Sequence, residues 1–128
     1  MPYILELKTV FSAAHAIVIN GWREPLHGHD WHVTVSVEAN ALDADGLVVD
    51  FHAITDQLKA IAGRFHNRSL NETPPFNTVN PTAELVAQHI GTELARWLEG
   101  APAAKGRGIR LKQVHITEAI GCAAVFVP

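Results

Sequence analysis

The stretch LHGHDWHVTVSVEA, residues 26–39, joins a His-x-His motif to a predicted β-strand at residues 31–39 whose two faces have different surroundings. Apolar and polar side chains alternate from residue 31 to residue 39. The apolar side chains of this segment are Trp31, Val33, Val35, Val37 and Ala39. Because successive side chains of a strand point to opposite faces, the pattern is typical of an antiparallel strand with one face buried and the other exposed.

Three other segments also predict strands. Residues 3–14 are rich in β-branched and aromatic residues and alternate in part. A turn signal at residues 43–46 follows the strand at 31–39. The last two strands are expected at about 109–118 and 121–127, so two predicted strands lie toward each end of the chain.

Two segments between these pairs of strands have apolar residues at helical spacing. Residues 51–64 follow Asp50, which stands where an N-cap belongs, and residues 82–99 form the second predicted helix. The polar, proline-bearing stretch 66–81 is predicted to be a loop, and residues 100–108 are predicted to be a flexible connection.

The predicted elements follow the order strand, strand, helix, helix, strand, strand (ββααββ), which indicates an α+β fold. We expect a four-stranded antiparallel sheet with the two helices on one face. A chain of 128 residues without an internal repeat or a long linker is predicted to form a single domain over residues 1–128.

The composition excludes several classes of protein. Apolar residues make up 48% of the chain and charged residues 18%, as in an ordinary globular protein rather than a disordered one. The net charge is −3 and the ten Lys and Arg residues are scattered, so we expect no nucleic-acid partner. No apolar stretch reaches about 18 residues and the N-terminal segment lacks the pattern of a signal peptide, so we expect no membrane partner.

The chain has a single cysteine, Cys122, which excludes an internal disulfide. A reducing cytoplasm is therefore the expected compartment. As a lone small residue in an apolar strand, Cys122 is expected to lie in the core.

Histidine is frequent, with eight residues, and three of them have a spacing that suits a metal ion. His27 and His29 flank Gly28, so in a strand their side chains point to the same side, roughly 7 Å apart along the backbone. If the strand at 3–14 pairs with this one as a hairpin, His15 comes level with the two. Three imidazoles without a fourth protein ligand form the open arrangement of a catalytic zinc site, although a His-x-His pair alone also occurs by chance.

Five motifs taken together resemble the 6-pyruvoyltetrahydropterin synthase family, which includes the 6-carboxytetrahydropterin synthases of the queuosine pathway. The resemblance runs from His15 to Glu118, with the motifs in the family's order and spacing. The motifs are FSAAH (11–15), LHGH (26–29), VVDF (48–51), NPTAE (80–84) and VHITE (114–118).

The resemblance implies a fold, an assembly and a set of ligands. It implies a tunnelling-type fold (T-fold) in which trimers close a β-barrel and two trimers stack into a homohexamer, with sites at the subunit interfaces. It also implies Zn²⁺ on His15, His27 and His29, and a small-molecule 7,8-dihydropterin substrate made from GTP.

Two further residues match family positions near the substrate. Glu118 matches the glutamate that anchors the pterin, since a carboxylate can accept two parallel hydrogen bonds from the ring N–H and the exocyclic amine. The alternative for Glu118 is a strand residue that faces solvent. Thr82 matches a residue near the pterin and could equally be the cap that starts a helix.

The sequence departs from the family at the catalytic base. Family members that elaborate the pterin side chain use a cysteine a few residues before HGH, and the segment GWREPLHGH (21–29) has none. Glu24 matches a subgroup that has a glutamate three residues before HGH. That subgroup is associated with cleavage of 7,8-dihydroneopterin triphosphate to 6-hydroxymethyl-7,8-dihydropterin. On its own, Glu24 would be a solvated loop carboxylate.

The second departure concerns the Asp-His pair that the family has just before a Leu-Asn. Counting back from Leu70-Asn71, those two places hold His66 and Asn67; a shift of one residue would put Phe65 and His66 there instead. The pair is broken in both cases, and His66 remains a candidate acid or base. His32 and His52 have no motif match and are expected to be solvated.

Three functions remain open from the sequence. The resemblance favours a zinc-dependent carbon–carbon lyase that acts on 7,8-dihydroneopterin triphosphate, with Glu24 as base. The first alternative is a 6-carboxy- or 6-pyruvoyl-tetrahydropterin synthase that uses another proton route. The second is a non-catalytic paralogue that binds a pterin or purine, for which the broken Asp-His pair is the main argument.

Overall fold

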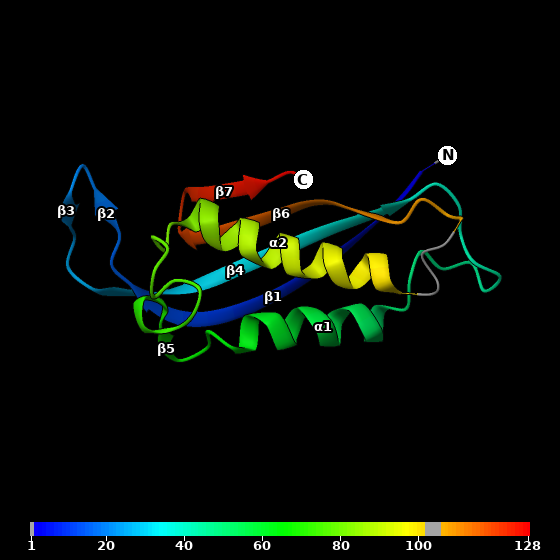
Figure 1. The fold of residues 1–128 in the computed structure, drawn as a ribbon. Coiled ribbons are helices and arrows are strands. Elements are labelled where there is room, and N and C mark those ends of the chain that lie inside the picture. Colours follow the sequence, from blue (N-terminus) through cyan, green and yellow to red (C-terminus); the bar gives the residue numbers. More distant parts are fainter. Residues whose placement is uncertain (1, 102–105) are drawn as a thin grey trace.

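The computed structural model describes residues 2–101 and 106–128, which form a sheet covered on one face by two helices (Figure 1). The sheet has the strand order β5-β1-β4-β6-β7, and all neighbours are antiparallel except β1 and β5. The predicted α+β fold is confirmed, but the sheet has five strands rather than the predicted four, because the short β5 adds a parallel strand beside β1. The strands of this sheet are β1 (Tyr3–His15), β4 (His27–Ala39), β5 (Arg68–Ser69), β6 (Arg110–Ala119) and β7 (Cys122–Phe126).

The pairing of β1 with β4 is the longest contact between two strands and positions both ends of the sheet. The register runs from Tyr3 opposite Ala39 to His15 opposite His27 without a break. All five apolar side chains predicted for one face of β4 are at most 1% exposed, whereas His32 on the other face is exposed. The predicted buried face is therefore confirmed, whereas the opposite face is exposed only in part, since Ser36 is 6% exposed.

The two helices, α1 (Phe51–Gly63) and α2 (Ala83–Gly100), begin at side-chain caps. A carboxylate oxygen of Asp50 accepts a hydrogen bond from the backbone N–H of His52 at 2.9 Å. The hydroxyl of Thr82 accepts one from the backbone N–H of Leu85 at 3.1 Å. Each cap satisfies an N–H group that the helix itself leaves unpaired, which explains why the helices start at these residues.

The core lies between the helices and the covered face of the sheet. Near the end of the sheet that carries His15, the ring of Phe11 stacks on that of Trp31 at 5.7 Å, and the Trp31 indole N–H donates to the Ala13 carbonyl at 3.1 Å. On α2, Gly91 lies against Phe126 of β7, and a Cβ at this glycine would be 2.6 Å from the Phe126 ring. The absence of a side chain at Gly91 therefore lets the helix approach the last strand closely.

The structure adds short elements that we did not predict from the sequence. The segment after β1 forms a hairpin of β2 (Val18–Ile19) and β3 (Trp22–Arg23), which extends from the end of the sheet (Figure 1). Its turn residues Asn20 and Gly21 have φ values of 52° and 78°, as a two-residue Asn-Gly hairpin turn requires.

Two predicted boundaries need correction. The predicted loop at 66–81 contains β5 and a 3₁₀ helix, η1 (Leu70–Glu72). β4 begins at His27 rather than at residue 31, because β1 continues to His15 and pairs with it. Residues 102–105 of the predicted connection at 100–108 lie outside the described residues.

Cys122 is exposed, so the prediction that it lies in the core is wrong. It is the first residue of β7, the outermost strand of the sheet, and follows the turn at 120–121. An apolar neighbourhood in the sequence does not bury the end of an edge strand, because only one of its sides is covered by the sheet.

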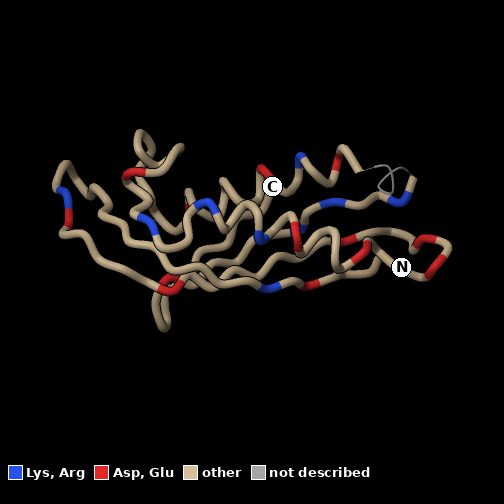
Figure 2. Tube along the Cα trace, turned by 90° about the horizontal axis from the view of Figure 1, so that it is seen from below, with Lys and Arg blue, Asp and Glu red and all other residues tan. Residues whose placement is uncertain are grey.

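Charged residues are spread over the described chain. In Figure 2, the Lys and Arg residues are spread over several parts of the tube, with Asp and Glu residues between them, and do not form one basic surface. No helix in the described part of the chain is long and apolar enough to cross a membrane.

His89 on α2 is a partly buried ionisable group away from the ends of the sheet. Its ring lies 5.6 Å from the rings of both Phe65 and Phe76, and its Nε2 has no hydrogen-bond partner among the described residues. Burial lowers the pKa of His89 below its ordinary value of about 6.5, while Glu93 opposes this shift and Arg64 adds to it.

We expect His89→Leu to make stability less dependent on acid. The unfolded chain takes up a proton on His89 at a higher pH than the folded chain does, so the free energy of unfolding decreases as the pH falls below about 6.5. The Leu variant should lose this contribution. Its Tm, measured by thermal unfolding, should therefore change less with pH than that of the unmodified protein. The matched control is His52→Leu, because His52 is 96% exposed; equal slopes for both variants would contradict the assignment.

Candidate metal centre

Three histidines meet where β1 ends and β4 begins. His15 pairs with His27, and Ala13 pairs with His29, so the three imidazoles project from the covered face of two adjacent strands. Their ring centroids are separated by 4.7 Å (His15–His27), 5.2 Å (His15–His29) and 4.7 Å (His27–His29). One nitrogen from each lies within 4.8 Å of the others, so the structure brings the three predicted ligands together.

Two backbone carbonyl groups determine which nitrogen faces the centre. The Nδ1 of His15 lies 2.8 Å from the Pro81 carbonyl oxygen, and the Nδ1 of His27 lies 2.9 Å from that of Pro25. A carbonyl oxygen can only accept, so Nδ1 carries the hydrogen in both rings and the Nε2 lone pair is left free. This is the arrangement that outer-shell partners impose on metal-binding histidines.

The free nitrogens fit a divalent metal ion. The Nε2 atoms of His15 and His29 are buried and have no hydrogen-bond partner among the described residues, which is uncommon for buried polar atoms. Burial lowers the pKa of His29, an effect that Glu118 opposes and that His27 and His15 reinforce. A neutral imidazole is the form that binds a metal, so the donor set suits Zn²⁺ with a position left for another ligand.

Two carboxylates flank the three histidines. On β6, the oxygens of Glu118 lie 3.7 Å from the Nε2 of His15 and 4.0 Å from that of His29. On the other side, Glu24 lies 3.5 Å from the Nε2 of His27. The two side chains are only 25% and 21% exposed, so neither is the freely solvated carboxylate that was the alternative from the sequence.

Backbone groups hold the carboxylate of Glu24. The backbone N–H of Ile17 donates to Glu24 Oε1 at 3.1 Å, and the backbone N–H of Glu24 donates to the Ile17 carbonyl at 3.0 Å. Glu24 directly follows the hairpin of β2 and β3, which returns the chain to the residue just beyond β1. The hairpin therefore brings Glu24 next to His27 although no regular strand contains it.

Glu118 also borders a cavity of about 180 Å³ beside the start of α2. Thr82 caps α2 and lines this cavity, so the two alternatives that the sequence left for it are compatible. Cys122, which the sequence placed in the core, lines it as well. The cavity is lined by Ile17, Thr82, Ala83, Glu84, Glu118, Cys122, Ala123 and Ala124.

His66 lies apart from the other candidate residues. It is exposed beside the outer edge of β1, where its Nδ1 accepts a hydrogen bond from the backbone N–H of Ser12 at 3.1 Å. The next residue, Asn67, has a φ of 59° and donates its own N–H to the Ser12 carbonyl. The structure thus gives His66 an orientation but does not bring it to the histidine cluster of its own chain.

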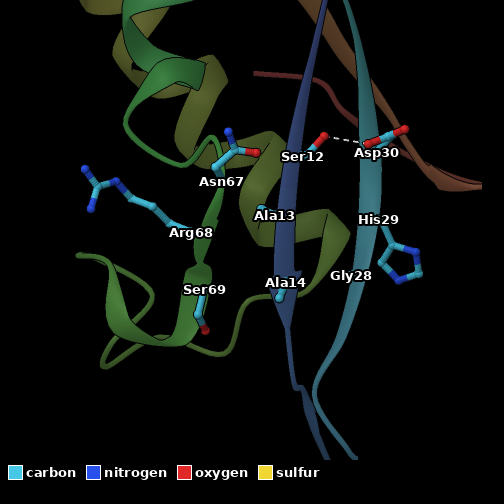
Figure 3. Close-up of a pocket in the computed structure, with 9 residues that line it drawn as sticks. All are labelled: Ser12, Ala13, Ala14, Gly28, His29, Asp30, Asn67, Arg68 and Ser69. Carbon is cyan, nitrogen blue, oxygen red and sulfur yellow. Dashed lines mark hydrogen bonds between the residues drawn. The ribbon is translucent and has the colours of Figure 1, made fainter.

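A cavity of about 560 Å³ lies beside the start of β4 and is not centred on the histidine cluster. Of the three histidines only His29 borders it, and Figure 3 shows the His29 ring pointing away from Asn67 and Arg68 across the strands. Ser12 and Asp30 on the same wall are joined by a hydrogen bond of 2.6 Å. Since ligand geometry rather than volume indicates a metal site, we place the candidate centre at the histidines.

Sequence reasoning missed two side chains close to the centre, Asn71 and Asn80. Asn71 bonds to the backbone of Ala16, and Asn80 bonds to the backbone of Val18. Both stand inside stretches that were singled out for other reasons, Leu70-Asn71 and NPTAE. Nothing in a sequence indicates which backbone a distant amide side chain will contact, so only the fold reveals them.

Comparison with known proteins identifies similar chains. Residues 4–128 match the family model described as 6-pyruvoyl tetrahydropterin synthase. A 6-carboxy-5,6,7,8-tetrahydropterin synthase of Bacillus subtilis is 30% identical over 106 residues, which are 77% of this chain and 70% of the relative.

Solved structures show the same fold. The 6-pyruvoyl tetrahydropterin synthase of Caenorhabditis elegans has a TM-score of 0.82 at 19% identity, over 100% of this chain and 96% of the other. A variant of the Plasmodium vivax 6-pyruvoyltetrahydropterin synthase, in which alanine replaces a catalytic glutamate, has a TM-score of 0.78 at 18% identity, over 98% and 97%. The expected T-fold topology is therefore confirmed.

We expect His29→Ala to weaken Zn²⁺ binding by at least about 100-fold, because loss of a ligand should cost no less than loss of an outer-shell partner. The measurement is competition with a chromophoric chelator. The control is His32→Ala, on the opposite face of the same strand, which should bind Zn²⁺ like the unmodified protein. Equal affinities of the two variants would remove His29 from the metal centre.

Proposed function

The chain belongs to the 6-pyruvoyl tetrahydropterin synthase family, and from this premise we propose that it is a zinc-dependent lyase acting on 7,8-dihydroneopterin triphosphate. The proposed product is 6-hydroxymethyl-7,8-dihydropterin. His15, His27 and His29 would hold the zinc, Glu118 and Thr82 would bind the pterin, and Glu24 would be the base.

The position of Glu24 is the observation that carries this proposal. Its carboxylate lies 3.5 Å from the Nε2 of His27, so a substrate oxygen at the metal centre would be within reach of it. No cysteine precedes the HGH motif, and the only cysteine of the chain, Cys122, lies at the start of β7. In the P. vivax relative a glutamate is a catalytic residue, which supports the same role here.

Glu118 suits recognition of the pterin ring. Its carboxylate borders the 180 Å³ cavity at the start of α2 and points from there toward His15 and His29. A carboxylate can accept two parallel hydrogen bonds from a ring N–H and the adjacent amine, which fixes the plane of a flat ligand. A ring held in this way would direct its side chain toward the three histidines and Glu24.

The chemistry then needs one base and one electron acceptor. Zinc held by the three imidazoles would supply Lewis-acid polarisation of the substrate's side-chain hydroxyl groups. Glu24 takes the proton of the hydroxyl on the second side-chain carbon, and that oxygen becomes an aldehyde as the bond between the first and second carbons breaks. The electron pair passes into the C6–N5 imine of the dihydropterin ring, and a proton is returned to the first carbon. The products are 6-hydroxymethyl-7,8-dihydropterin and glycolaldehyde triphosphate.

His66 has no step in this scheme. It was a candidate acid or base from the sequence, and a role for it would require a second copy of the chain, because it lies at the outer edge of β1.

A second candidate is a 6-carboxytetrahydropterin synthase. The observation that favours it is the B. subtilis relative, which bears that name and is 30% identical. The same metal centre and pterin anchor would serve both reactions, and the product distinguishes them.

Homo-oligomer formation, as a dimer of trimers, is part of the proposal. It is supported by the edges of the sheet: among the described residues, the outer side of β1 pairs only at residues 13–14, with β5, and β7 has a neighbour on one side only. Unpaired strand edges are surfaces on which another copy can pair. A cytoplasmic location and a single functional domain over residues 1–128 complete the proposal.

The decisive assay incubates zinc-loaded protein with 7,8-dihydroneopterin triphosphate and identifies the products by mass. We expect 6-hydroxymethyl-7,8-dihydropterin, and Glu24→Gln should lower kcat by about 10²–10⁴-fold, because an amide cannot accept the proton. Glu99→Gln, at an exposed position near the end of α2, should leave kcat unchanged. A carboxylated product would establish the second candidate, and unchanged substrate would refute both.

For the anchor, we expect Glu118→Gln to weaken binding of 7,8-dihydroneopterin by about 10- to 100-fold, the cost of losing hydrogen bonds to a charged acceptor. Fluorescence titration of the pterin measures this, with Glu99→Gln again as control. Zinc affinity should be retained. If the variant instead lost zinc as strongly as it lost pterin, Glu118 would be a metal ligand rather than an anchor.

A further inference from the structure

We propose that Asn71 and Asn80 are positioning residues that fix the backbone of residues 16–18 and thereby hold His15 and Glu24 in their working geometry. The expected effect on catalysis rests on the proposed function. The expected effect on metal binding rests only on the histidine cluster. The two asparagines belong to residues 70–82, named here the 70–82 segment, which comprises η1 and the stretch that leads to α2.

Asn71 pairs with Ala16 through both of its polar atoms. The backbone N–H of Ala16 donates to Asn71 Oδ1 at 2.8 Å, and Asn71 Nδ2 donates to the Ala16 carbonyl at 2.8 Å. This is the exchange of two hydrogen bonds that a neighbouring strand would make. Ala16 directly follows the metal ligand His15 and is only 1% exposed, so water cannot replace the lost partner.

Asn80 repeats the same pairing two residues further on. The backbone N–H of Val18 donates to Asn80 Oδ1 at 2.9 Å, and Asn80 Nδ2 donates to the Val18 carbonyl at 3.0 Å. Val18 is the first residue of β2 and starts the hairpin that leads to Glu24. Since Val18 is 46% exposed, loss of Asn80 should disturb geometry more than stability.

The residue between these two pairs bonds to Glu24 instead. Ile17 donates its N–H to the Glu24 carboxylate and accepts from the Glu24 N–H. The backbone polar groups of three consecutive residues are thus all used, by Asn71, Glu24 and Asn80 in turn. A rotation of this stretch would therefore displace Glu24 relative to His27, and the hydrogen bonds to the two asparagines oppose it.

The 70–82 segment has a third contact, with the residue that directly precedes this stretch. The Pro81 carbonyl, next to Asn80, accepts the hydrogen bond from His15 Nδ1. An amide side chain suits the other two points because it presents one acceptor and one donor, like a peptide group. Aspartate would keep the acceptor but lose the donor, and leucine would lose both while keeping a similar size.

The metal-binding test compares Zn²⁺ affinity in Asn71→Leu and Asn71→Asp by chelator competition at a temperature where both are folded. We expect the Leu variant to bind Zn²⁺ about 10- to 100-fold more weakly, as when an outer-shell partner is removed. The affinity of the Asp variant should fall less. The matched control is Thr78→Val in the same segment, because the Thr78 hydroxyl bonds only to the Pro75 carbonyl at 3.2 Å. If Asn71→Leu does not fold, the Asp variant decides.

The second test separates geometry from affinity at Asn80. We expect Asn80→Leu to lower kcat by about 10-fold or more with little change in KM or Zn²⁺ affinity. Asn80→Asp should have a kcat between those of Asn80→Leu and the unmodified protein. An independent readout is hydrogen exchange at the Ile17 and Val18 amides, which should accelerate in Asn80→Leu and not in Thr78→Val.

The proposal is overturned if folded Asn71→Leu binds Zn²⁺ like Thr78→Val, or if Asn80→Leu keeps the original kcat and amide protection. Failure of the proposed function is a different result. If the unmodified protein leaves 7,8-dihydroneopterin triphosphate unchanged, the zinc-affinity and hydrogen-exchange measurements still decide the positioning role of the two asparagines.

Discussion

The pairing of β1 with β4 is the interaction on which the rest of the structure depends. Its unbroken register sets His15 opposite His27 and places His29 opposite Ala13. It also brings the buried Trp31 ring into edge contact with the His15 ring, with the two ring centroids 4.8 Å apart. A slip of one residue would turn every side chain of one strand to the other face. The covered faces of β1 and β4 therefore hold the three imidazoles in register, because the same alternation serves the core and the candidate metal centre.

This dependence explains which features the sequence could predict. The period of two in β4 predicted its buried face, and the same period placed His27 and His29 on one side, with His15 level with them once the strands pair. The helices were predicted from apolar spacing and from Asp50 and Thr82 at their starts. Apart from the position of His15, which also needs the strand pairing, these features follow from patterns within a few consecutive residues, so they could be derived before the fold was known.

The features that were missed depend on packing between segments far apart in the chain. Asn71 and Asn80 meet residues 16 and 18 across 55 and 62 positions, and no local pattern marks such a contact. The exposure of Cys122 follows from its strand lying at the edge of the sheet, which the order of strands along the chain does not reveal. The β2–β3 hairpin was missed for a different reason: although Asn20-Gly21 is a local turn signal, the flanking strands are only two residues long, too short to show alternation.

The carbonyl groups of Pro25 and Pro81 affect how the sequence of this site can change in evolution. They select the imidazole nitrogens that face the centre, yet a carbonyl oxygen is present on every amino acid. The side chains at these two positions can therefore drift without loss of the hydrogen bonds, provided that the path of the main chain is inherited. Part of the site's chemistry is thus invisible to residue conservation, and relatives with different residues here can retain the same tautomers.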